Sequence, residues 1–131
     1  MRVGLDTSVV LRLLVGQPKD QTERAVEFLD ELSQRGDEPV MSDIVAAEVY
    51  FALQHHYGIS KRNSLAGMRS LFKSGEIKPL GAVTEVLAIN GIASAKPGFV
   101  DRLIHAAYLQ DAEALATFEK ASKKLKSARV L

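Results

Sequence analysis

Short apolar segments alternate with longer amphipathic segments along the chain, and this alternation restricts the fold more than any other feature of the sequence. A short apolar segment bounded by Gly, Pro or polar residues is typical of a strand, whereas apolar residues spaced by three and four are typical of a helix. Strands that are separated by helices usually pair in parallel. We therefore predict an α/β fold with three layers (α/β/α), in which helices flank a short central parallel sheet.

The predicted strands are residues 3–5, 39–41, 77–80, 115–118 and 128–131. The first predicted helices are residues 7–15, a segment opened by Pro18 and Asp20 that ends near Gly36, residues 43–57, and a segment capped by Ser60. The later ones are residues 82–96, which Gly91 interrupts, residues 99–110, and a short lysine-rich segment before the last strand. No repeat or low-complexity linker divides them. The expectation is a single domain over residues 1–131.

The composition of the chain bears on its size class, its membrane association and the kinds of metal ligand it can offer. A chain of 131 residues with 47% hydrophobic residues can bury one substantial core. No apolar run approaches the ~20 residues that cross a bilayer, and the first residues do not resemble a signal peptide, so we expect a cytoplasmic protein with no membrane association. The chain has no cysteine. A metal site would therefore use oxygen or histidine ligands.

The net charge of +1 conceals an uneven distribution. Residues 1–58 hold five Lys or Arg against ten Asp or Glu, whereas residues 59–131 hold twelve against six. Such asymmetry fits an acidic centre beside a surface that attracts phosphate groups. The lysine-rich end of the chain is equally compatible with an ordinary solvated face.

Two carboxylates directly follow predicted strands. Asp6 follows the strand 3–5 within an apolar stretch, and Glu119 follows the strand 115–118. A charge in such a position costs free energy unless it is paired, binds a cation or lies at the edge of the buried element. Ligands of α/β sheets bind at the carboxyl ends of the strands. We expect both acids at that edge, although Glu119 could instead only open the next helix.

Two further carboxylates lie on predicted helices. Glu48 is the only charged residue of the apolar segment 44–53, which predicts a buried carboxylate. No Lys or Arg lies within one helical turn of it, which favours a functional role over a local ion pair. Asp101 lies in the first turn of the helix 99–110, where the helix dipole alone would also favour an acid. If the four acids converge, a hard cation such as Mg²⁺ or Mn²⁺ would keep them ionised.

Four segments, taken in order, resemble the motifs of PIN-domain ribonucleases, and most closely those of VapC-type toxins from type II toxin–antitoxin pairs. The segment "LDTSVVLRLL" is similar to the family's "LDTNVL.RLL", and "SDIVAAEVYFAL" is similar to "S.....EV...L". Further along, "FVDRLIHA" is similar to "F.D.LI.A", and "LATFEKASKKL" is similar to "L.TFD....KL". The resemblance extends from the first predicted strand to the last and is least distinctive between residues 75 and 97.

The resemblance implies a Mg²⁺- or Mn²⁺-dependent endoribonuclease that hydrolyses RNA phosphodiester bonds. It assigns catalysis and metal binding to four acids: Asp6, Glu48, Asp101 and Glu119. It also implies that Thr7 or Ser8 supports the site through a hydroxyl group. The sequence departs from the family pattern at Ser8, where the family often has Asn, at Glu119, where it usually has Asp, and at Ala121, where it often has another acid. Whether one or two ions bind therefore stays open.

Partners follow from the same resemblance: RNA as substrate, a second copy in a homodimer, and a VapB-type antitoxin. Basic residues near two of the acids are candidates for binding the RNA backbone: Arg102, Lys120, Lys123 and Lys124. An alternative is a non-catalytic or weakly active PIN-like module whose acidic groove binds a partner peptide or RNA. The acidic patterns that receiver domains and haloacid-dehalogenase-type phosphatases need are absent.

A metal-free ribonuclease would need two histidines as acid and base. His55 and His56 are adjacent and so lie about 100° apart on a helix, which prevents them from acting together on one phosphate. His105 lies one turn after Asp101 and is expected to have a structural or supporting role.

Overall fold

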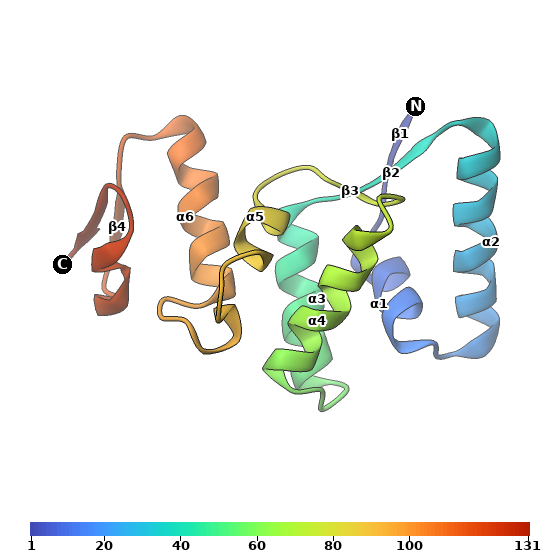
Figure 1. The fold of residues 1–131 in the computed structure, drawn as a ribbon, viewed down its shortest axis with the longest axis horizontal. Coiled ribbons are helices and arrows are strands. Elements are labelled where there is room, and N and C mark those ends of the chain that lie inside the picture. The colour runs from blue at the N-terminus through green and yellow to red at the C-terminus, as the bar shows by residue number, and fades with distance from the viewer. The chain divides into compact units, whose positions relative to one another are not determined.

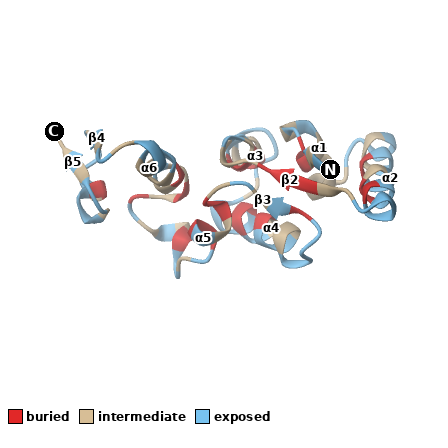
Figure 2. Cartoon of the chain, turned by 90° about the horizontal axis from the view of Figure 1, so that it is seen from above, coloured by how far each residue is buried: buried red, intermediate tan, exposed pale blue.

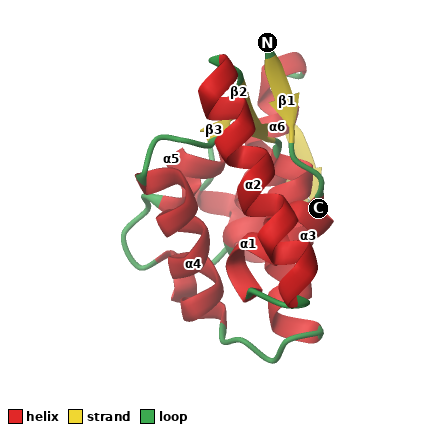
Figure 3. Ribbon diagram, turned by 90° about the vertical axis from the view of Figure 1, so that its right-hand side faces the viewer, coloured by secondary structure: helices red, strands yellow, loops and turns green.

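The computed structural model describes residues 1–131, which form two compact units, Met1–Leu80 and Gly81–Leu131. Its elements are six α-helices, two short 3₁₀ segments and five short strands, and all strand pairs are parallel. Figure 1 follows the chain through these elements, and Figure 3 colours them by secondary structure. The predicted α/β class with parallel strands is confirmed. None of the helices combines the length and the apolar character that crossing a bilayer requires.

The first unit contains a three-stranded parallel sheet in the order β1-β2-β3. Its elements are β1 (Arg2–Gly4), α1 (Thr7–Val15), α2 (Lys19–Arg35), β2 (Glu38–Met41), α3 (Asp43–His55), α4 (Lys61–Lys73) and β3 (Lys78–Pro79). In register, Gly4 lies opposite Val40 and Met41 opposite Pro79. Two helices connect each strand to the next, as a parallel sheet requires. The strands therefore end at one edge, where α1 and α3 begin.

Side chains and backbone conformation fix the helix ends of this unit near their predicted positions. The Ser42 hydroxyl accepts a hydrogen bond from the Val45 amide at the start of α3, and Ser60 does the same for Asn63 at the start of α4. Gly36 ends α2 with a φ of 72°, a left-handed conformation that favours glycine. Predicted and observed boundaries agree closely because these local signals decide them.

Both units have buried apolar cores (Figure 2). In the first unit, β2 is buried from Pro39 to Met41, as expected for the middle strand of a parallel sheet. Helices contribute Leu32 from α2 and Val49 from α3, both with no exposed surface. The second unit buries Phe99 at the start of α6.

The second unit contains α5 (Val83–Leu87), η1 (Ile92–Ser94), α6 (Phe99–Asp111), β4 (Leu115–Thr117), η2 (Lys120–Lys124) and β5 (Ala128–Val130). Strands β4 and β5 pair in parallel as a separate two-stranded sheet, with Leu115 opposite Ala128. The strands are thus divided between two sheets. The predicted lysine-rich helix is the 3₁₀ segment η2.

The helix predicted over residues 82–96 is wrong in its extent. Only Val83–Leu87 is α-helical, and a 3₁₀ turn follows at Ile92–Ser94. Gly91, which the prediction treated as an interruption, has a φ of 71°. A left-handed residue cannot continue a right-handed helix, so the chain turns there and buries Ile92 separately.

Candidate functional site

Asp6 lies where β1 ends and α1 begins. The backbone of β1 is held to β2 beyond the strand, because the Leu5 amide donates to the Val40 carbonyl at 2.9 Å. Asp6 is the N-cap of α1, and its Oδ1 accepts a hydrogen bond of 2.8 Å from the Thr7 amide. The carboxylate is exposed. Asp6 therefore lies at the carboxyl end of β1, as predicted, and the first amide of α1 holds its Oδ1 in place.

Thr7 holds the Glu48 side chain near Asp6 through a hydrogen bond. The Thr7 hydroxyl donates to Glu48 Oε1 at 3.0 Å, across 41 residues of sequence. Since Thr7 also donates its amide to Asp6, a single residue contacts both carboxylates. Of the two hydroxyl groups expected to support the site, Thr7 makes this contact, whereas Ser8 lines a groove between α1 and α2.

The burial predicted for Glu48 is wrong. Its helix α3 buries one face, which includes Val49 and Tyr50, while Glu48 is exposed on another together with Ile44 and Phe51, which are 76% and 46% exposed. The sequence pattern misled because α3 has more apolar residues than the first unit covers.

On the buried face of α3, burial raises the pKa of the Tyr50 hydroxyl above its usual value of 10.0, whereas a hydrogen bond with the Gln54 side chain acts to lower it.

The other two predicted acids belong to the second unit. Asp101 is exposed in the first turn of α6, whose N-cap Gly98 supplies no side chain. Glu119 follows β4 at its carboxyl end, as predicted, and caps η2 by accepting the Ala121 amide at Oε1 (3.1 Å). The prediction of one sheet edge shared with Asp6 is wrong, because β4 pairs with β5 in a sheet of its own and not with the sheet that contains β1. Its own amide donates to Thr117 Oγ1 at 3.0 Å. Glu119 thus opens a helical segment as well as marking a strand end.

None of these four carboxylates forms an ion pair with a Lys or Arg side chain. Glu48 Oε2 and Asp6 Oδ2 are left without a protein donor. Within each unit, no three carboxylates or imidazoles form a complete metal site. The structure brings Asp6 and Glu48 together through Thr7, and it fixes Asp101 and Glu119 each at the start of a helical segment.

The basic residues expected to bind the RNA backbone differ in how exposed their side chains are. Lys120, Lys123 and Lys124 are exposed on η2, directly after Glu119. Arg102 is half-buried, and its Nε donates to the Pro97 carbonyl at 2.8 Å, which ties α6 to the preceding loop.

The histidines have structural contacts. His105 Nε2 donates to the Lys126 carbonyl at 2.7 Å and so links α6 to the loop before β5, in agreement with its expected structural role. His55 is exposed and stacks on Phe51, with ring centroids 6.1 Å apart. Neither contact resembles a pair of imidazoles aimed at one phosphate.

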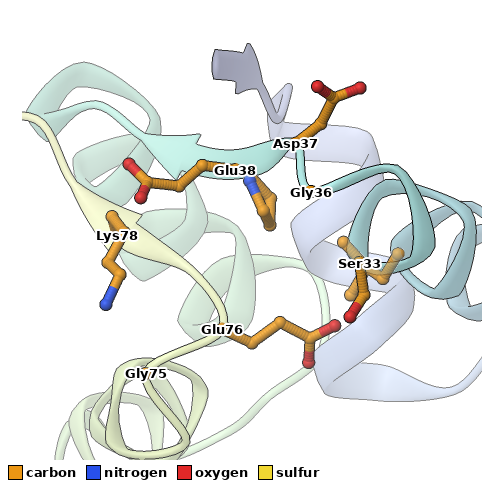
Figure 4. Close-up of a pocket in the computed structure, with 9 residues that line it drawn as sticks. Ser33, Gly36, Asp37, Glu38, Gly75, Glu76 and Lys78 are labelled. Atoms are coloured by element: carbon orange, nitrogen blue, oxygen red, sulfur yellow. The ribbon is translucent and has the colours of Figure 1, made fainter. Parts of the chain in front are cut away.

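A separate pocket of about 250 Å³ opens at the other end of the sheet, where β2 and β3 begin (Figure 4). Glu38, Glu76 and Lys78 line it. Asp37, which also lines it, forms ion pairs with the Met1 amino group at 3.0 Å and with Arg35 Nε at 3.4 Å. This pocket lies at the amino ends of the strands and is not part of the candidate site.

The family model of the PIN domain matches residues 3–127 and therefore runs through both units. The chain belongs to the PIN-domain family. Neither the comparison with curated proteins nor the comparison with solved structures gave a significant match. PIN domains are generally nucleases and typically use divalent metal ions. For this PIN domain, nuclease chemistry on RNA is accordingly the indicated activity.

The donor set of this PIN domain fits such an ion in chemical type. Mg²⁺ and Mn²⁺ prefer carboxylate oxygens, and the unpaired oxygens of Asp6 and Glu48 are of this kind. Exposed carboxylates with no cationic partner remain available to a metal ion. The absence of cysteine leaves no competing soft ligand.

Proposed function

We propose that this PIN domain is a Mg²⁺- or Mn²⁺-dependent endoribonuclease that hydrolyses RNA phosphodiester bonds. The observation that carries the proposal is the contact of Thr7 with two carboxylates, Asp6 and Glu48, at the sheet edge of a chain in a nuclease family. Carboxylates without cationic partners at such an edge are suited to holding a divalent ion.

The proposed metal ligands are four acids: Asp6, Glu48, Asp101 and Glu119. Thr7 is proposed as the positioning residue, because its hydroxyl restricts the orientation of the Glu48 carboxylate and its amide restricts that of Asp6. A bound Mg²⁺ or Mn²⁺ supplies positive charge that makes a nearby water more acidic and offsets the negative charge on the phosphate oxygens. The carboxylates set the place at which this charge acts.

The proposed substrate side of the site is basic. Lys120, Lys123 and Lys124 are exposed next to Glu119 and are suited to binding phosphates, with Arg102 as a further candidate. Attack by water, rather than by the ribose 2′-hydroxyl, predicts products with a 5′-phosphate and a 3′-hydroxyl.

We also propose the finer assignment that the motifs favour: a cytoplasmic VapC-type toxin, homodimeric and held inactive by a VapB-type antitoxin. What supports it is the agreement of four ordered segments with that class. Co-purification of the protein with the product of an adjacent gene, together with the measured mass of the isolated chain, tests both partners.

One observation favours an alternative, a non-catalytic PIN-like module that binds a peptide or RNA. Glu119 replaces the usual Asp, and its Oε1 is engaged in capping η2, which gives this acid a structural use. A weak fourth ligand would reduce catalysis while leaving the acidic surface intact.

Cleavage of a structured RNA by the purified protein separates the two functions. We expect cleavage with Mn²⁺ or Mg²⁺, restoration of activity when Mn²⁺ is returned after EDTA treatment, and 5′-phosphate ends on the products. A cyclic or 3′-phosphate product, or cleavage that persists in EDTA, contradicts the metal-dependent hydrolysis. Tight RNA or peptide binding with no cleavage at any Mn²⁺ concentration supports the binding module.

Thr7→Val is expected to lower the rate of RNA cleavage by about 10-fold, within the range observed when a partner of a metal ligand is removed. Valine keeps the shape of threonine but cannot donate to Glu48 Oε1. Thr7→Ser retains the hydroxyl and is the matched control, expected to cleave at nearly the wild-type rate. Single-turnover rates measured over a Mn²⁺ titration check this, and equal rates for the two variants would contradict the positioning role.

A further inference from the structure

A groove of about 560 Å³ lies between α1 and α2, which pack side by side in the first unit (Figure 1). Ser8 lies at its α1 end, two residues after Asp6. The groove is of the size that binds small molecules or one to two nucleotides. We call it the α1–α2 groove and define it by the side chains of Ser8, Val9, Arg12, Gln21, Arg24 and Phe28.

Two arginines of the groove lack anionic partners. Neither Arg12 nor Arg24 forms an ion pair, although α2 is rich in acids. Arg12 is half-buried, and its Nε donates to Gln21 Oε1 at 2.6 Å across the groove. This bond fixes the guanidinium at one corner and leaves its terminal nitrogens for another acceptor. Arg24 lies one turn after Gln21 on α2 and is exposed.

The rest of the lining is apolar or neutral. Val9 and the half-buried ring of Phe28 form apolar wall, and no carboxylate lines the groove. Guanidinium groups beside an aromatic ring suit a ligand that carries phosphates together with flat bases. An acidic peptide would use the arginines but would gain less from the ring.

We propose that the α1–α2 groove binds the backbone of single-stranded RNA beside the cleaved bond, with Arg12 and Arg24 contacting phosphates. This inference rests on the proposed ribonuclease function. Along α1, Asp6 and Arg12 are six residues apart, which is about 9 Å at the rise of an α-helix, a distance that a few nucleotides span. Asp6 itself does not line the groove, but Ser8, two residues later on the same helix, does. This short separation along α1 from the proposed metal ligand favours the substrate strand over a protein partner.

Binding of a fluorescent single-stranded RNA tests the groove without cleavage, in a protein that carries Asp6→Asn. Adding Arg12→Gln and Arg24→Gln is expected to raise the Kd about 25-fold at 0.1 M salt. It should also reduce the slope of log K against log salt by about 1.4, since each phosphate contact on a single strand contributes about 0.7. Arg24→Gln alone, at an exposed position, is expected to raise the Kd about 5-fold and guards against misfolding.

The matched control removes two exposed charges outside the groove, with Lys61→Gln and Arg62→Gln at the start of α4. It should change the Kd less than about 3-fold, because charges that do not contact the RNA are largely screened at 0.1 M salt. Equal losses for the two double variants overturn the proposal. So does a groove variant that loses binding to poly-glutamate but keeps its affinity for RNA.

These experiments distinguish a failure of the groove assignment from a failure of the proposed ribonuclease function. If wild-type protein cleaves RNA with Mn²⁺ while the groove variant binds RNA normally, the ribonuclease stands and the groove assignment fails. If the wild-type protein neither binds nor cleaves RNA, both fail.

Discussion

Asp6→Asn is expected to reduce the rate of RNA cleavage at least about 100-fold, because it removes the charge with which the proposed first metal ligand attracts a cation. The fold should persist. Asparagine is as good an N-cap as aspartate, and its Oδ1 can accept the Thr7 amide in the same way. Single-turnover cleavage at saturating RNA, with circular dichroism of the same sample, measures the two properties.

The control for this variant is Asp30→Asn, which removes one exposed negative charge from α2 at a residue that is neither a proposed metal ligand nor part of the α1–α2 groove. It should leave cleavage within about 2-fold of the wild-type rate, since an isolated surface charge has little effect at physiological salt. Comparable activity in Asp6→Asn and wild type would exclude Asp6 as a metal ligand. Direct titration of Mn²⁺ into both proteins adds a readout that does not depend on RNA.

Leu32→Ala is expected to lower the free energy of unfolding by about 2–5 kcal/mol, the range for large-to-small changes in a packed core. Leu32 has no exposed surface and lies on the inner face of α2. The methyl groups it loses leave a cavity that neighbouring elements fill only in part. Urea titration followed by far-ultraviolet circular dichroism checks this through the midpoint at constant slope.

Val26→Ala on the same helix is the comparison for this core change. Val26 is 46% exposed, so its truncation should cost well under 1 kcal/mol and the better helix propensity of alanine offsets part of that. If both variants shifted the urea midpoint equally, α2 would not pack through the face that the structure assigns to the core.

Much of the fold could be predicted from the sequence because local signals decide it. Ser42 and Ser60 cap helices at the predicted positions, and Gly36 ends α2. The strand ends that carry Asp6 and Glu119 were predicted for the same reason, since a polar residue directly follows a short apolar run. Such features depend on a few neighbouring residues and so can be identified without the tertiary structure.

Features that depend on packing were predicted less well. The apolar composition of α3 indicated a buried Glu48, yet exposure depends on which neighbours cover each face. The contact between Thr7 and Glu48 joins residues 41 positions apart, and spacing cannot reveal it. The α1–α2 groove was missed for a similar reason: Arg12 and Arg24 lie on different helices, and only their lack of acidic partners marks them.

Asp6 accepts a hydrogen bond from the first amide of α1, and Glu119 accepts one from the second amide of η2. These bonds have a thermodynamic consequence. Each bond restricts the rotation of its carboxylate as soon as the helical segment forms, before any ligand arrives. A cation that binds them would therefore order little that is not already ordered, and its affinity would be correspondingly higher. Substitutions that loosen either helix start should weaken ion binding even when the carboxylate itself is retained.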